Sequence, residues 1–148
     1  MYEQLVYEQL VYVSRAMPDL NAKGAYDIIR VSHNRNSKYG LTGTLILLDG
    51  YLLQVLEGHR HALRERFAII EVGPRHTDIS VRHSITMSER GFPNEWMALR
   101  HGDAVEEDLK LDFGYLPGFP ETHFGGEKLV EFALACYHPY RKTQPGSL

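Results

Sequence analysis

The stretch that decides the fold reads Leu52-Leu53-Gln54-Val55-Leu56-Glu57-Gly58, and it places a glutamine inside an otherwise apolar run. Asp49-Gly50 precedes it, a pair typical of the tight turn between two strands of a β-hairpin. The stretch is therefore predicted to be the second arm of a hairpin, in which Gln54 shares one face with two leucines. Because an amide buried without hydrogen-bond partners costs roughly 2–7 kcal/mol, Gln54 needs a polar partner, either a side chain or a bound ligand.

Length and composition indicate one domain with short appendages, since 148 residues suffice to bury a hydrophobic core. A net charge of −3 argues against a nucleic-acid binder that relies on electrostatic attraction. The eight histidines take no tight metal-ligand spacing with cysteines or carboxylates, so no metal site is expected. The single cysteine, Cys136, excludes an internal disulfide. Without a signal-peptide pattern or an apolar run of about 18 residues, we expect a cytoplasmic protein that does not associate with a membrane.

The N-terminus contains a short repeat, in which Tyr-Glu-Gln-Leu-Val occupies residues 2–6 and again 7–11. Only the second copy continues into Tyr12-Val13-Ser14, whose β-branched and aromatic residues are typical of a strand. The first copy is either an extended start of this strand or an accident of gene annotation.

Hydrophobic periodicity and turn residues predict the elements that follow the first strand. In order, they are a helix, two hairpin strands, a second helix and two further strands, over 25–38, 41–48, 51–56, 58–73, 79–86 and 96–100. This β-α-β-β-α-β-β order is the ferredoxin-like arrangement of the α+β class, with two helices on one face of a mixed sheet. It divides the chain into a domain over 1–101 and a C-terminal extension over 102–148.

The extension is predicted to contain helices over 105–113 and 127–137. The longer helix is apolar almost all round, a pattern that indicates burial against the uncovered sheet face or against a partner subunit.

Three polar residues stand out in otherwise structural segments: Tyr12, Asn36 and Gln54. From the residues alone, an ordinary structural role is favoured over a functional one for each, as a strand aromatic, a helix C-cap and a core amide bonded to backbone. A ferredoxin-like fold alone does not indicate a function.

Several motifs together carry a resemblance to a known family. They are Leu10-Val11-Tyr12-Val13-Ser14-Arg15, Asn36 followed by Gly40-Leu41-Thr42-Gly43, Leu53-Gln54-Val55-Leu56-Glu57-Gly58, and Pro74-Arg75-His76. Over about residues 8–101 their order and approximate spacing resemble the BLUF family, blue-light sensors of bacteria and algae that bind flavin. The resemblance implies FAD as the cofactor, with FMN also possible.

By this resemblance, Tyr12 and Gln54 are the photoactive pair and Asn36 holds the pyrimidine edge of the flavin. The residues at flavin-pocket positions are Ile28, Ser32, Arg35, Asn36, Leu45, Gln54, Arg75 and His76, with His76 favoured over Arg75 for a direct contact. Arg35 stands where many members have Asn or His, and Ile69 takes a helix position that is often polar. These two departures are expected to tune colour, lifetime or affinity without abolishing flavin binding.

The implied chemistry suits a phenol and an amide. After light, Tyr12 gives an electron to the flavin and its proton passes through Gln54, whose donor and acceptor ends then exchange bonding partners. The family result is a rotated or tautomerised Gln54 with a stronger hydrogen bond to the flavin carbonyl.

A further departure concerns residues 92–97, which read Phe-Pro-Asn-Glu-Trp-Met where the family commonly has Phe-Pro-Asp-Trp-Ser-Met. Without a gap, Met97 keeps the methionine position, whereas Trp96 stands one residue late and Glu95 takes the tryptophan position. A one-residue shift in a strand moves a side chain to the other face. We therefore expect Met97 beside Gln54 and Trp96 facing outward, with a β-bulge as the alternative that restores the tryptophan.

These features predict a blue-light photoreceptor and not an enzyme, because the residues after Leu99 are too few for an ordinary catalytic output domain. Its signal would pass to a protein partner or through a homo-oligomer, with the helix around 129–137 as the leading surface and internal packing of that helix as the alternative. The rival functions are a light-independent flavin enzyme and a flavin-free regulatory interaction module of the same fold.

Overall fold

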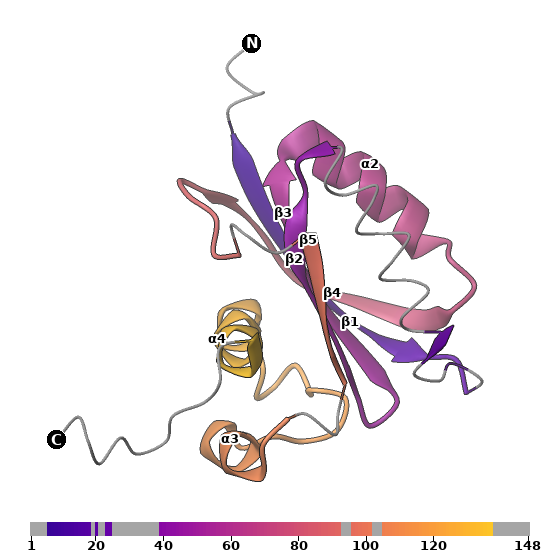
Figure 1. The fold of residues 1–148 in the computed structure, drawn as a ribbon, viewed down its shortest axis with the longest axis vertical. Helices are drawn as coiled ribbons and strands as arrows, with labels where there is room; N and C mark the ends of the chain where they lie inside the picture. Colours follow the sequence, from indigo (N-terminus) through magenta and orange to yellow (C-terminus); the bar gives the residue numbers. More distant parts are fainter. Residues whose placement is uncertain are drawn as a thin grey trace, which may run out of the picture.

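The computed structural model describes residues 6–18, 20, 23–24, 39–92, 96–101 and 105–137, and over 96–101 it describes the backbone alone. The helix predicted over 25–38 lies outside these residues. The described elements are β1 (Tyr7–Ala16), β2 (Thr42–Leu48), β3 (Tyr51–His59), α2 (Arg60–Glu71), β4 (His76–Met87), β5 (Trp96–His101), α3 (Glu107–Phe113) and α4 (Gly126–Tyr137) (Figure 1). None of the helices in this described part of the chain is long and apolar enough to span a bilayer.

A five-stranded mixed sheet, ordered β4-β1-β3-β2-β5, forms the centre of the molecule. β1 pairs antiparallel with β3 and β4, β2 pairs antiparallel with β3, and β5 runs parallel to β2. Figure 1 shows α2 on one side of this sheet and α3 and α4 on the other. The predicted α+β, ferredoxin-like class with additional C-terminal helices is confirmed.

The turn between β2 and β3 has the predicted hairpin geometry. Asp49 and Gly50 have φ angles of 51° and 82°, and the flanking residues Leu48 and Tyr51 are paired in the sheet. Two successive residues with positive φ are typical of a type I′ turn, whose twist matches that of the strands it joins. The Asp-Gly pair therefore sets the register that places Gln54 in β3.

The second helix begins at Arg60, so the prediction that Gly58 opens it is wrong. Gly58 lies inside the sheet, opposite Glu8. A Cβ added to Gly58 would lie 2.4 Å from Cδ2 of Leu41. The glycine therefore allows a side chain to approach the strand backbone closely, and β3 continues past it to His59.

Two hydrophobic cores form, one on each face of the sheet, because residues of a strand alternate between the two faces. The core beneath α2 contains Leu10, Tyr12, Ala16, Leu41, Leu45, Leu47, Leu52, Leu56 and Leu63. The opposite core combines Val11, Val13, Ile46, Leu48, Leu53 and Val55 of the sheet with apolar residues of the C-terminal segment.

Helix α4 is packed within the chain itself. Its residues Leu129, Phe132 and Ala133 have no exposed surface, and they belong to the core that lies on the sheet face opposite α2. Of the two predicted ways of burying this helix, the structure shows packing against the uncovered sheet face.

The start of α4 meets a histidine of β4, which predicts a pH-dependent stability. Nε2 of His83 lies 2.8 Å from Oε1 of Gln9, and a Cβ on Gly126 would lie 2.2 Å from the Nδ1 atom of His83. Burial lowers the pKa of His83, and the nearby carboxylate of Glu127 opposes this shift.

A histidine with a lowered pKa in the folded state binds its proton preferentially in the unfolded state, so its contribution to stability falls as the pH drops below about 6.5. We expect His83→Gln to reduce the loss of thermal stability between pH 7.5 and 5.5, measured as the melting temperature by circular dichroism. His61→Gln, which alters a histidine that is 88% exposed, is the control. Equal pH dependence in all three proteins would contradict this prediction.

Candidate functional site

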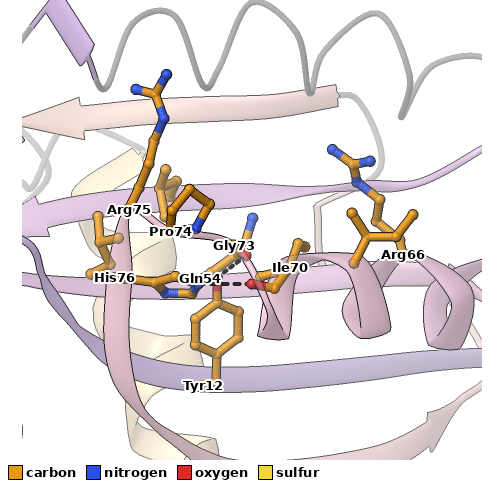
Figure 2. A pocket seen from close by; sticks show the side chains of 11 residues that line it. Tyr12, Gln54, Arg66, Ile70, Gly73, Pro74, Arg75 and His76 are labelled. Atoms are coloured by element: carbon orange, nitrogen blue, oxygen red, sulfur yellow. Dashed lines mark hydrogen bonds between the residues drawn. The ribbon is translucent and has the colours of Figure 1, made fainter.

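The glutamine of β3 has the tyrosine of β1 as its polar partner. Tyr12 and Gln54 are directly opposite each other in the antiparallel β1–β3 pair, and the Tyr12 hydroxyl donates a hydrogen bond to Oε1 of Gln54 (Figure 2). Both residues are buried, with 2% and 5% of their surface exposed. The requirement for a polar partner of Gln54 is therefore met by a residue 42 positions away in the sequence.

The environment of Tyr12 keeps its phenol protonated. Burial raises the pKa of Tyr12 well above its usual range, and the positive charge of Arg66 opposes this shift without cancelling it. The ring packs between Phe67 of α2 and His76 of β4, with centroid distances of 5.6 and 5.9 Å. The phenol is thus held as a neutral hydrogen-bond donor aimed at Gln54.

His76 joins three elements beside this pair. Its Nε2 atom lies 2.9 Å from the carbonyl oxygen of Ile70 in α2, and its Nδ1 atom lies 2.6 Å from Oγ of Ser14 in β1. A carbonyl can only accept, so Nε2 carries a proton, and in the neutral imidazole Nδ1 accepts from the Ser14 hydroxyl. His76 therefore fixes the end of α2 against the sheet.

A pocket opens between α2 and the sheet above these groups. Its lining consists of Tyr12, Leu45, Leu52, Gln54, Arg66, Ile69, Ile70, Gly73, Pro74, Arg75 and His76 (Figure 2). Most of its wall is apolar, and the few polar groups include a phenol and an amide that lie side by side. Such a lining suits a flat aromatic ligand with a hydrogen-bonding edge, because apolar walls bury the rings and a few polar groups orient them.

Comparison with known proteins identifies the family. The family model described as "Sensors of blue-light using FAD" (BLUF) matches residues 7–98. The chain belongs to the BLUF family. BLUF domains are flavin-binding sensors, so the predicted flavin cofactor is confirmed, and the pocket around Tyr12 and Gln54 fits it.

Relatives of this BLUF chain include larger light-regulated proteins. It is 34% identical over 87 residues to "Photoactivated adenylate cyclase subunit beta" of Euglena gracilis, an alignment that covers 59% of this chain and 10% of the relative. The chain therefore corresponds to about a tenth of the length of that curated relative.

Two solved structures have similar folds. "BlrB - a BLUF protein, dark state structure" superposes with a TM-score of 0.71 at 28% identity, covering 88% of this chain and 96% of BlrB. Klebsiella pneumoniae BlrP1 with FMN and cyclic diGMP has a TM-score of 0.65 at 27% identity, covering 72% of this chain and 28% of BlrP1.

The structure brings together five of the residues expected to form the BLUF flavin site. Tyr12, Leu45, Gln54, Arg75 and His76 all line the pocket. The Arg75 guanidinium is directed away from Tyr12 (Figure 2) and its Nη1 atom donates to the carbonyl of Gly24 at 3.1 Å. The remaining expected pocket residues, Ile28, Ser32, Arg35 and Asn36, lie outside the described residues.

Sequence reasoning missed Ser14 and Arg66 as parts of this site. Ser14 stands two residues after Tyr12, so the alternation of a strand places both on one face, and this spacing was the available signal. Arg66 is next to Phe67 in α2 and lines the pocket, but an arginine at the edge of an apolar helix stripe ordinarily faces water.

The strand that carries Trp96 and Met97 contains an irregularity. Gly43 pairs with Trp96 and Thr44 pairs with Ala98, so β5 has one extra residue at this point. Gly43 belongs to β2 and also lies close to the backbone of β3, since a Cβ on it would lie 1.8 Å from the carbonyl oxygen of Val55. The bulge considered from the sequence is therefore present in the backbone, whereas the side chains of Trp96 and Met97 lie outside the described ones, and their placement stays a prediction.

Proposed function

We propose that this BLUF chain senses blue light through a transfer of an electron and a proton that involves Tyr12, Gln54 and the bound flavin. The observation that carries the proposal is the hydrogen bond from the buried Tyr12 hydroxyl to Oε1 of Gln54 inside an apolar pocket. A phenol that is neutral, buried and already bonded to an amide is positioned to lose an electron and a proton together.

The steps assigned to the protein follow from these contacts. A bound flavin would supply the blue-light absorption and the acceptor for one electron. Tyr12 supplies this electron, and its proton passes to Oε1 of Gln54 along the existing hydrogen bond. Return of the electron, together with a proton from the Gln54 amide, restores the neutral phenol of Tyr12 and leaves Gln54 rotated or tautomerised, with its donor turned to the flavin edge. The low polarity around the pair strengthens the new hydrogen bond.

Other residues are assigned to holding the cofactor. Leu45, which is paired with Gln54 in the sheet, provides an apolar wall, and His76 fixes the end of α2 beside the pair. By family resemblance, Asn36 holds the pyrimidine edge, and Ile28, Ser32 and Arg35 complete the pocket.

We further propose that the chain turns over no substrate itself and that its output passes to a protein partner or through self-association. The apolar stripe of α4 is poorly suited as a docking surface for a partner, because Leu129, Phe132 and Ala133 are fully buried against the sheet. A signal that reaches a partner through this helix must therefore alter how the helix is held.

An absorption spectrum before and after blue light tests the proposal. We expect a yellow protein whose flavin band shifts slightly to the red in light and recovers in darkness. Bleaching of the band would contradict the mechanism, because it indicates a covalent adduct or full reduction. Steady consumption of a reductant in the dark would favour a flavin enzyme, and a protein that stays colourless with added FAD would favour a flavin-free module.

We keep the prediction that Met97 lies beside Gln54 and Trp96 faces outward, and the irregularity of β5 makes a tryptophan restored to the pocket the alternative to test. We expect Trp96→Ala to leave the rate of dark recovery nearly unchanged, because the substitution removes no contact to the flavin or to Gln54. Met97→Ala is the matched comparison and is expected to change that rate. A large change in Trp96→Ala, measured by flash spectroscopy, would show that the bulge turns the tryptophan to the pocket.

A further inference from the structure

The edge strand β4 carries an extra residue directly beside the photoactive tyrosine. Val11 pairs with His83 and Tyr12 pairs with Val81, so Arg82 has no partner position on β1. This is a β-bulge, in which two residues of one strand oppose one residue of the other. Bulges turn side chains out of the regular alternation and interrupt the hydrogen-bond ladder locally.

The bulge directs two successive side chains of β4 toward the C-terminal segment. Arg82 contacts the backbone of the loop between α3 and α4, and the next residue, His83, meets Gly126 at the start of α4. In a regular strand these two side chains would lie on opposite faces of the sheet. The extra residue therefore lets both side chains contact the C-terminal segment, next to the hydrogen bond that the Ser80 hydroxyl of β4 donates to Glu121 at 2.6 Å.

The Arg82 guanidinium binds the loop over 118–124 through several of its atoms. Its Nη1 atom donates to the carbonyls of Phe119 and Phe124 at 2.5 and 2.9 Å. Its Nη2 atom lies 3.5 Å from the carbonyl of Gly118, and Nε lies 3.8 Å from the Glu121 carboxylate. Hydrogen bonds from a charged donor are about twice as strong as neutral ones. Only 6% of the Arg82 side chain is exposed, so its charge is buried between β4 and this loop.

The bound loop also supplies part of the core. The side chains of Phe119 and Phe124 are fully buried and pack edge to face with a centroid distance of 5.4 Å. Phe119 in turn contacts Phe132 of α4 at 5.3 Å. A change at Arg82 can therefore reach α4 through these packed aromatic rings, because a close-packed interior transmits small displacements of its side chains.

We propose that Arg82 is the positioning residue that couples the Tyr12–Gln54 pair to the C-terminal segment over 105–137. This inference rests on the proposed function. A light-driven change in the bonding of Tyr12 alters β1 directly opposite the bulge, where the hydrogen-bond ladder is locally interrupted. The shift loosens the bonds from Arg82 to the carbonyls of Phe119 and Phe124, so the loop and α4 are held less firmly in the light.

Hydrogen–deuterium exchange of the flavin-loaded full chain, in darkness and under blue light, tests the coupling. In the wild type, backbone exchange over 118–124 is expected to be faster in light. In Arg82→Gln, exchange there is expected to be fast in both conditions, so the light–dark difference is lost while the flavin red shift keeps its size.

Two further variants make the result specific. Lys128→Gln removes a cation that lies 4.5 Å from the centre of the Phe124 ring without touching β4, and it is expected to keep the wild-type light–dark difference. Arg82→Lys keeps the charge but replaces the guanidinium, whose Nη1 and Nη2 atoms reach three loop carbonyls, by a single ammonium group, so the difference is expected to shrink. Arg82→Lys also provides the test if Arg82→Gln does not fold.

The outcomes separate the two hypotheses. A wild type that shows the red shift but no light–dark difference in exchange over 118–124 overturns the role of Arg82. An Arg82→Gln variant that keeps the full light–dark difference overturns it as well. Where Arg82→Gln does not fold, the same result in Arg82→Lys overturns it. A wild type with no red shift overturns the proposed function, and the coupling then falls with it.

Discussion

Tyr12→Phe is expected to keep its flavin and to lose the light-induced red shift completely. The substitution removes only the hydroxyl that donates to Oε1 of Gln54 and preserves the ring that packs against Phe67 and His76. Without that hydroxyl no proton can pass to the amide, so Gln54 has no reason to exchange its bonding pattern. Difference spectra before and after blue light, at equal flavin occupancy, measure the effect.

A second tyrosine provides the matched control. Tyr115 donates its hydroxyl to Asp49 at 2.6 Å, and it is not among the residues that line the pocket. Tyr115→Phe therefore removes one tyrosine hydroxyl elsewhere and should keep the full red shift. A normal photocycle in Tyr12→Phe would show that Tyr12 is not the donor.

Phe132→Ala is expected to lower the free energy of unfolding by about 3–5 kcal/mol, the usual range for a fully buried phenylalanine. The side chain has no exposed surface and contacts Phe113 and Phe119 edge to face, at 5.4 and 5.3 Å. Its removal leaves a cavity between α4 and the sheet that the surrounding rings cannot fill without moving. Urea unfolding at fixed flavin concentration measures the change, since bound ligand itself adds stability.

Leu111→Ala is the control for that measurement. Leu111 lies in α3 and is 75% exposed, so its truncation should change the free energy of unfolding by no more than about 0.5 kcal/mol. Equal effects of the two substitutions would mean that α4 is not held through Phe132.

Much of the fold follows from short-range patterns. The Asp49-Gly50 turn, the helical stripe that becomes α2 and the apolar character of α4 all predict elements that the structure contains. The start of α2 was predicted wrongly because a glycine at position 58 is locally compatible both with the start of a helix and with the interior of a strand. Its actual role depends on Leu41, a residue whose approach is visible only in three dimensions.

The Tyr12–Gln54 pair shows how much one buried polar residue indicates about a site. The burial of Gln54 required a partner, and family resemblance named Tyr12, which the sheet places directly opposite. Ser14 and Arg66 escaped notice because their types are ordinary at a strand end and on a helix.

The tertiary structure decided that α4 packs on the sheet and not on a partner subunit, and it decided the position of the extra residue at Arg82. Hydrophobic periodicity depends on near neighbours, and it therefore specifies the elements and the face that each one buries. A strand register depends on pairing along its whole length, and Arg82 owes its bulge to the pairing of β4 with β1, more than 60 residues earlier in the chain. The local sequence preference of β4 does not specify this bulge, because its position depends on the pairing and packing of β4 and β1 along their whole length.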